Sequence, residues 1–297
     1  MNRGILMAVL SSLIFSVMNA FVKAVSLNIP IGEIVFFRSA IGAILIFFMM
    51  KKKKVTFSKT GIPMLALRGA LGALYLIAYF YTIANLPLTD ASILAHLSPF
   101  FAILFAFMFL KEKLSKTVWM VIPIAFLGGM LVIKPFDYST YSIYALAGIL
   151  SAVFAAGAAT SIRYLSSKHH SYEIVFYFLA TAAVISIPLM WNQFVIPSSS
   201  ELFFLICIGV VSLLGQIFLT KAFTHENVVV VEVTRYIGIV FNALWGLLFW
   251  FEVPDIYTIA GGVLIVGSCI MLSSRRNTTH PGVEHKRIMN RKKFSRQ

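Results

Sequence analysis

Two apolar stretches of the chain carry ionisable and hydrogen-bonding side chains with helical spacing. Ser92 and His96 lie four residues apart within 88–110, and Glu232, Arg235 and Tyr236 lie close together within 228–251. Polar groups are costly inside lipid and normally face the interior of a helix bundle, where they mark a substrate or ion pathway. These residues predict a polar site at membrane depth, in which a carboxylate and a guanidinium offer opposite charges to a substrate.

Each of these residues also has a purely structural interpretation. Glu232 precedes Arg235 by three residues, so the two can form an ion pair that only holds the helix in place. His96 could carry a proton because imidazole titrates near neutrality. A single histidine in a helix can equally be a hydrogen-bonded packing residue. The sequence leaves both alternatives open.

Three further candidates belong to stripes in which polar or aromatic residues recur every three or four positions. Asn19 shares its stripe with small serines, Tyr79 follows another tyrosine, and Gln216 stands between a serine and a threonine. Such residues can also serve helix packing or interface belts. The predicted substrate-binding residues are Asn19, Tyr79, Ser92, His96, Gln216, Glu232, Arg235 and Tyr236. Most of the charged residues nearer the helix ends are interpreted as anchors or gate contacts; these residues are Arg38, Arg68, Arg163, Glu33, Glu112, Glu173 and Glu252.

The sequence contains no arrangement typical of an enzyme. It has no His-Glu-x-x-His, no Gly-x-Ser-x-Gly, no cysteine pair at metal-binding spacing and no phosphate-binding loop. We therefore predict no catalytic residue, no metal site and no cofactor. The lack of a nucleotide-binding module also argues against a primary pump and leaves exchange, facilitated diffusion or ion coupling.

The composition predicts a polytopic, all-α integral membrane protein. Hydrophobic residues make up 59% of the 297 residues and charged residues 12%, far from the shares of a soluble domain. A spanning helix needs about 20 mainly apolar residues, and ten segments qualify. They are approximately 4–26, 32–50, 63–86, 88–110, 117–134, 141–163, 172–191, 201–222, 228–251 and 255–273.

The chain repeats itself at an interval of 140 residues. Glu33-Ile34-Val35-Phe36-Phe37 returns as Glu173-Ile174-Val175-Phe176-Tyr177, and Glu112 matches Glu252 at the same offset. Five helices per repeat is an odd number, so the second repeat must cross the membrane with the opposite polarity. We expect two inverted five-helix repeats, at 1–134 and 141–273, with the site where they meet.

Basic residues predict the orientation of the helices. Lysine and arginine gather in alternate connections, including Lys51 to Lys54, and in the tail 274–297. Because such residues stay cytoplasmic, both termini are expected inside. The net charge of +14 therefore reflects topology and not nucleic-acid binding. We expect the tail to be disordered and to lie on anionic membrane lipid.

Several short motifs resemble the drug/metabolite transporter superfamily, EamA type, over residues 4–273. They are Arg68 to Gly72, Leu86 to Ala91, Ser98 to Phe101, Glu112 to Leu114, Lys134-Pro135, Lys221 to Phe223 and Tyr236 to Glu252. The resemblance implies ten helices, inverted repeats, a central cavity, and substrates such as amino acids, their derivatives or S-adenosylmethionine. The sequence departs from the pattern at Ile239, where the second repeat lacks a match for Pro99, and at Arg235.

We therefore expect a secondary transporter of the bacterial cytoplasmic membrane that moves a small polar metabolite by alternating access. Export of an amino acid or related compound is the leading expectation. Uptake or exchange of S-adenosylmethionine and flipping of a lipid intermediate are the alternatives, and a membrane scaffold or sensor is the non-transport alternative. The sequence is compatible with proton coupling and with either a monomer or a homodimer.

Overall fold

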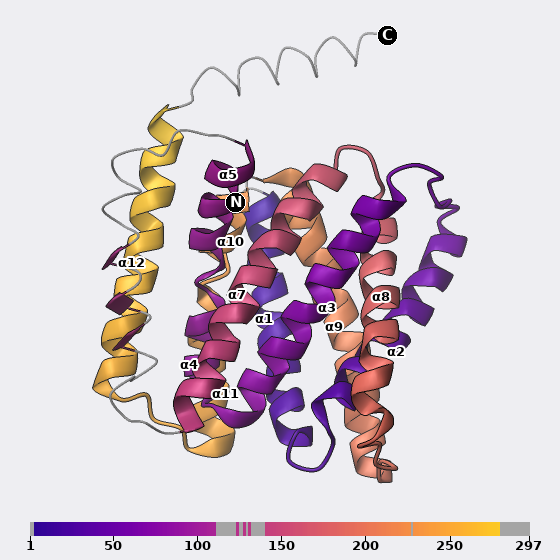
Figure 1. Ribbon diagram of the computed structural model, residues 1–297, viewed down its shortest axis with the longest axis horizontal. Coiled ribbons are helices and arrows are strands. Elements are labelled where there is room, and N and C mark those ends of the chain that lie inside the picture. Colours follow the sequence, from indigo (N-terminus) through magenta and orange to yellow (C-terminus); the bar gives the residue numbers. More distant parts are fainter. Residues whose placement is uncertain are drawn as a thin grey trace.

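The computed structural model describes residues 3–110, 123–124, 127–128, 130–131, 140–226 and 228–279. These residues form helices joined by short connections (Figure 1). The helices are α1 (Arg3–Val25), α2 (Ile31–Lys52), α3 (Ile62–Asn85), α4 (Leu88–Ala95), α5 (Ser98–Leu110), α7 (Thr140–Leu165), α8 (Ser171–Trp191), α9 (Ser199–His225), α10 (Val228–Thr234), α11 (Ile237–Trp250) and α12 (Ile256–Thr279).

The helices of the described chain agree with the predicted spans in order and position. Seven helical segments are long and apolar enough to cross a membrane. Most of the predicted span 117–134 lies outside the described residues. The last helix, α12, continues past residue 273 into the predicted tail, and residues 280–297 of that tail also lie outside the described part.

Prolines and a glycine mark helix boundaries at positions that the sequence predicts. Pro30 and Pro87 immediately precede α2 and α4, where a missing N–H costs nothing. Gly61 precedes α3 with a φ of 75°, in the left-handed region that glycine adopts without strain. Ser198 and Glu201 form a reciprocal capping box at the start of α9. These local signals keep the connections short.

The two spans that carry the main candidate residues are not continuous helices, which corrects the prediction for 88–110 and 228–251. Each consists of two short helices, α4 and α5 in the first and α10 and α11 in the second. In the first span Pro99 cannot donate a backbone hydrogen bond, and its ring crowds the carbonyl four residues earlier. In the second span Gly238 N–H bonds the Arg235 carbonyl at 2.8 Å instead, so a tight turn forms without proline.

The helices of the two repeats pack against each other in the pairs expected of a two-fold symmetry relation. The extensive contact of α1 with α9 corresponds to that of α7 with α3, and α2 packs on its own counterpart α8. In Figure 1 the start of α1 and the end of α12 lie at the same end of the bundle, while α4 and α11 lie together at the other. This arrangement fits two inverted repeats with interrupted helices meeting near the centre.

The outer faces of the helices carry large apolar side chains. Ile44 and Phe48 on α2, Val184 on α8 and Leu248 and Phe249 on α11 are each more than half exposed. On a water-soluble protein so much exposed apolar surface would promote aggregation, whereas in a bilayer it contacts lipid tails. The protein is therefore an integral membrane protein.

Close packing of α3 against α8 depends on Gly69. A Cβ at this position would lie 2.7 Å from Thr181 Cβ and 3.0 Å from the Tyr177 carbonyl oxygen. We expect Gly69→Ala to lower the stability by about 1–3 kcal/mol through overpacking, measured as a lower midpoint of thermal unfolding in detergent. Gly267→Ala is the matched control, because a Cβ there meets nothing within 4 Å. Equal midpoints for the two variants would contradict the packing described here.

Candidate functional site

A central cavity lies where the two repeats meet. It has a volume of about 80 Å³ and is lined by side chains from helices of both repeats. Among the lining residues are Asn19, Tyr79, His96, Gln216, Glu232 and Arg235.

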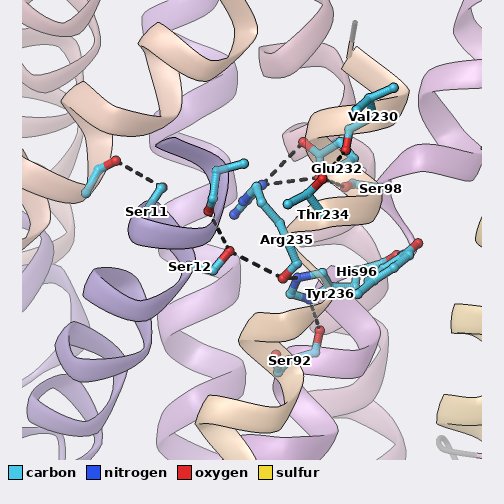
Figure 2. Close-up of polar contacts among 12 residues, drawn as sticks. Ser11, Ser12, Ser92, His96, Ser98, Val230, Glu232, Thr234, Arg235 and Tyr236 are labelled. Carbon is cyan, nitrogen blue, oxygen red and sulfur yellow. Dashed lines mark hydrogen bonds and ion pairs between the residues drawn. The ribbon is translucent and has the colours of Figure 1, made fainter. Parts of the chain in front are cut away.

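Hydrogen bonds join the two interrupted helices at their breaks (Figure 2). The His96 ring places Nδ1 2.6 Å from the Ser92 carbonyl oxygen and Nε2 3.0 Å from the Arg235 carbonyl oxygen. In return, the Tyr236 hydroxyl donates to the His96 carbonyl at 3.0 Å. Both ring nitrogens of His96 lie near carbonyl acceptors, and a neutral imidazole can donate to only one of them.

Glu232 and Arg235 form an ion pair beside this junction. Arg235 Nη1 donates to the two Glu232 carboxylate oxygens at 3.3 and 3.2 Å, and the Ser98 hydroxyl donates to the same carboxylate at 3.2 Å. The Tyr75 hydroxyl lies within hydrogen-bonding reach of Arg235. The Glu232 side chain is 4% exposed and that of Arg235 16%. The pair therefore sits in the cavity wall with the guanidinium partly open to the cavity.

A chain of side-chain hydrogen bonds continues from α1 to α11 and α4. The Asn19 amide donates to the Tyr79 hydroxyl at 3.0 Å and to the Asn242 amide oxygen at 3.2 Å. The Asn242 amide in turn donates to the Ser92 hydroxyl at 3.1 Å. This network couples three helices of one repeat to the second interrupted helix.

The structure thus brings seven of the eight predicted residues into one connected region. Ser92 and Tyr236 are buried behind the cavity wall and hold the junction, while the others line the cavity. Gln216 lines the cavity too, but its side-chain amide donates to the Thr220 hydroxyl of its own helix, at 3.4 Å. Whether these residues bind substrate stays a prediction.

Sequence reasoning missed two arginines of the cavity wall. Arg38 and Arg68 were expected to be anchors or gate contacts, yet they line the cavity and are 1% and 3% exposed. Arg38 is the eighth residue of α2 and Arg68 the seventh of α3, which places both well inside their helices. Depth along the helix was the signal that could have identified them, as it did Arg235.

One end of the bundle is closed by an ion pair that joins the repeats. The Lys23 ammonium on α1 pairs with Glu252 after α11 and donates to the Leu86 carbonyl at 3.0 Å. The same carboxylate accepts the Leu88 N–H at 2.9 Å. The cavity lining instead extends toward Ile162 and Phe223, near the last turns of α7 and α9. The Lys23–Glu252 pair therefore joins α1 to the end of α11, away from the open part of the cavity.

Each glutamate of the repeated motif accepts hydrogen bonds from a connection in the other repeat. Glu33 accepts the Val195 N–H at 3.1 Å, and Glu173 accepts the Ser58 N–H at 2.6 Å and the Ser58 hydroxyl at 2.9 Å. Each carboxylate thereby holds the connection that follows its counterpart helix. This exchange fits the gate or anchor role predicted from their positions, and Glu112 lies outside the described residues.

An inverted pair of helical repeats, interrupted helices that meet at the centre, and a polar cavity between them are typical of secondary transporters. Comparison with known proteins agrees with this class. Residues 2–134 and 142–274 match the model of the EamA-like transporter family. The chain belongs to the EamA-like transporter family, and it is a transporter and not an enzyme.

The relatives include transporters of different substrates. The chain is 60% identical to the pseudopaline exporter CntI of Pseudomonas aeruginosa, over 92% of this chain and 96% of the relative. It is 25% identical to the S-adenosylmethionine uptake transporter of Rickettsia prowazekii, over 91% of this chain and 92% of that protein. One solved crystal structure shares the fold, with a TM-score of 0.66 and 19% identity, over 92% of this chain and 98% of the other.

Proposed function

We propose that the protein exports pseudopaline or a chemically similar small metabolite across the bacterial cytoplasmic membrane by alternating access. The similarity to a pseudopaline exporter over almost the full length of both proteins carries this proposal. The charged central cavity supports it, because an apolar solute would not need three arginines and a glutamate in the wall. Amino acids, the leading expectation from the sequence, become the less favoured substrates.

We further propose that both termini are cytoplasmic. The start of α1 and the end of α12 lie at the same end of the bundle, which fits the distribution of basic residues. In this orientation the Lys23–Glu252 pair closes the outer end, and the cavity extends toward the cytoplasmic ends of α7 and α9. The structure would then represent a state ready to take up a substrate from the cytoplasm.

The Asn19, Tyr79, Gln216, Glu232 and Arg235 side chains would contact the substrate directly in this proposal. Ser92 and Tyr236 would hold the junction between the interrupted helices, and His96 would do both. Opposite charges at Glu232 and Arg235 suit a molecule that carries both an ammonium and an acidic group. Alternating access would then require the junction at His96 and Tyr236 to change its hydrogen bonds.

Transport into inside-out membrane vesicles tests the proposal directly. Vesicles containing the protein should accumulate labelled pseudopaline faster than vesicles without it. Unlabelled pseudopaline should compete, whereas S-adenosylmethionine and a mixture of amino acids should not. Absence of accumulation, or competition by S-adenosylmethionine alone, would refute the assignment. Transport under an imposed pH gradient tests for proton coupling. His96 is the first residue to replace in that test, because two carbonyl acceptors lie beside its ring.

A further inference from the structure

Two buried guanidinium groups in the cavity wall have N–H donors without an acceptor among the described residues. For both Arg38 and Arg68 the Nε and Nη1 atoms are buried without a partner among the described residues. The side chains are almost fully buried, at 1% and 3% exposure. An uncompensated buried charge is strongly unfavourable, so such a group calls for an anion that the described part of the chain does not supply.

The surroundings of the two arginines are aromatic. Phe178 of α8 lies against both guanidinium groups, with its ring centroid 5.7 Å from Arg38 Cζ and 4.5 Å from Arg68 Cζ. Phe80 of α3 lies 5.8 Å from Arg38 Cζ. Aromatic faces attract and orient guanidinium groups but accept none of their N–H bonds in the normal way. The rings therefore hold the arginines in place and leave their donors available.

The helix that carries Arg68 also makes room for its guanidinium group. Gly72 follows Arg68 by one turn, and a Cβ there would lie 2.5 and 2.6 Å from two carbons of the Phe178 ring and would overlap Arg68 Nη1. Only glycine leaves space for the ring and the guanidinium side by side. The position of Arg68 is thus built into the packing of α3 on α8.

The charges around the cavity do not balance. Of the residues that the structure describes, the lining contains three arginines, Arg38, Arg68 and Arg235, and one carboxylate, that of Glu232. Glu232 is already paired with Arg235. With a neutral His96, two positive charges remain on the wall, both on the side formed by α2 and α3.

We propose that Arg38 and Arg68 form an anion-binding subsite for a substrate that carries at least two carboxylates. Guanidinium groups bind carboxylates through paired, charge-assisted hydrogen bonds, and two acidic groups neutralise the two unpaired cations. The Glu232–Arg235 pair then receives the remaining polar part of the molecule. This inference deepens the proposed function and rests on the same cavity.

Ligand-induced thermal stabilisation of the purified full-length protein in detergent tests the subsite. The probes are glutarate, its monomethyl and dimethyl esters, and inorganic phosphate, all at matched ionic strength. Glutarate should raise the unfolding midpoint, the monomethyl ester should do so less, and the dimethyl ester should not. Stabilisation by phosphate equal to that by glutarate would overturn the preference for two carboxylates.

Variants show whether the arginines carry this binding. Arg38→Gln and Arg68→Gln should each weaken the apparent affinity for glutarate about 10-fold to 100-fold, the worth of a hydrogen bond to a charged group. Lysine at either position keeps the charge but loses the paired donors, so Arg38→Lys should give an intermediate affinity. Arg163→Gln is the matched control, since Arg163 donates to the Phe223 and Glu226 carbonyls and is not among the cavity-lining residues. Its glutarate response should equal that of the wild type.

The unliganded midpoints separate binding from structure. Because the Nε and Nη1 donors of Arg38 and Arg68 have no acceptor among the described residues, their glutamine variants should unfold no earlier than the wild type. Earlier unfolding of these variants with an unchanged glutarate response would overturn the subsite. If pseudopaline transport persists while glutarate fails to bind, the subsite is wrong and the proposed function stands. If glutarate binds through both arginines but pseudopaline is not transported, the substrate assignment is wrong and the subsite stands.

Discussion

Replacing Glu232 by glutamine should reduce transport at least about 100-fold and lower the stability by about 3 kcal/mol. Glu232 accepts hydrogen bonds from Arg235 at 3.2 and 3.3 Å and from Ser98 at 3.2 Å, and its side chain is 4% exposed. Its neutralisation leaves Arg235 as a third unpaired cation in the cavity wall. Removing one partner of a buried ion pair costs about 3–5 kcal/mol, and the loss of a paired donor or acceptor of a charged substrate commonly costs a further 1.5–3 kcal/mol. Uptake into inside-out vesicles and thermal unfolding in detergent measure the two effects.

The double variant Glu232→Gln/Arg235→Met decides between the two interpretations of this pair. It removes both charges together, so the unfolding midpoint should return toward that of the wild type whichever interpretation is correct. Transport separates them. A pair that only holds α10 in place would allow transport to recover together with stability. If the pair binds the substrate, the double variant stays inactive although it is stable. Glu201→Gln changes a carboxylate at the start of α9, outside the cavity lining, and keeps a side chain that can complete the capping box. It is the control that should leave transport unchanged.

The repeat register explains why so much of the site could be predicted. An offset of 140 residues placed Ser92 and His96 opposite Glu232 and Tyr236, and the structure brings these segments together through the Tyr236 hydroxyl bond to the His96 carbonyl. The helix breaks after Ala95 and Thr234 were harder to predict than the pairing of these segments. Pro99 marks only the first break, and the second depends on hydrogen bonds between two distant segments.

The anion subsite escaped prediction for a different reason. Arg38 and Arg68 look like ordinary cations near helix ends until Phe178 of the other repeat is placed against both. No spacing within one helix encodes that contact, because it depends on how α8 packs on α2 and α3. The depth of a residue along its helix follows from the sequence. Whether the described residues offer its guanidinium group an acceptor depends on how all the helices pack together.

Neutralising Glu252 should open the end of the bundle that Lys23 now closes. The Glu252 carboxylate pairs with Lys23 of α1 and accepts the Leu88 N–H at 2.9 Å, so a single side chain joins α1, α4 and the end of α11. Both side chains are largely buried, at 12% and 17% exposure. Glu252→Gln weakens both contacts by about 1–3 kcal/mol in total, which corresponds to an open population about 5-fold to 150-fold larger.

Thiol labelling of a buried position near the ion pair measures this opening. Ala91 is 0% exposed and packs in the same apolar cluster as Val22 and Leu88, so Ala91→Cys, with Cys207 and Cys269 changed to serine, should react slowly in detergent. Adding Glu252→Gln should raise the labelling rate in proportion to the open population. Glu201→Gln removes a carboxylate that bonds Ser198 and Asn28 in a connection outside this contact, and should leave the rate unchanged. Equal rates in all three proteins would mean that the apolar packing alone keeps this end shut. A selective rise with Glu252→Gln would establish the Lys23–Glu252 pair as a gate, because alternating access requires contacts at each end that are weak enough to break in turn.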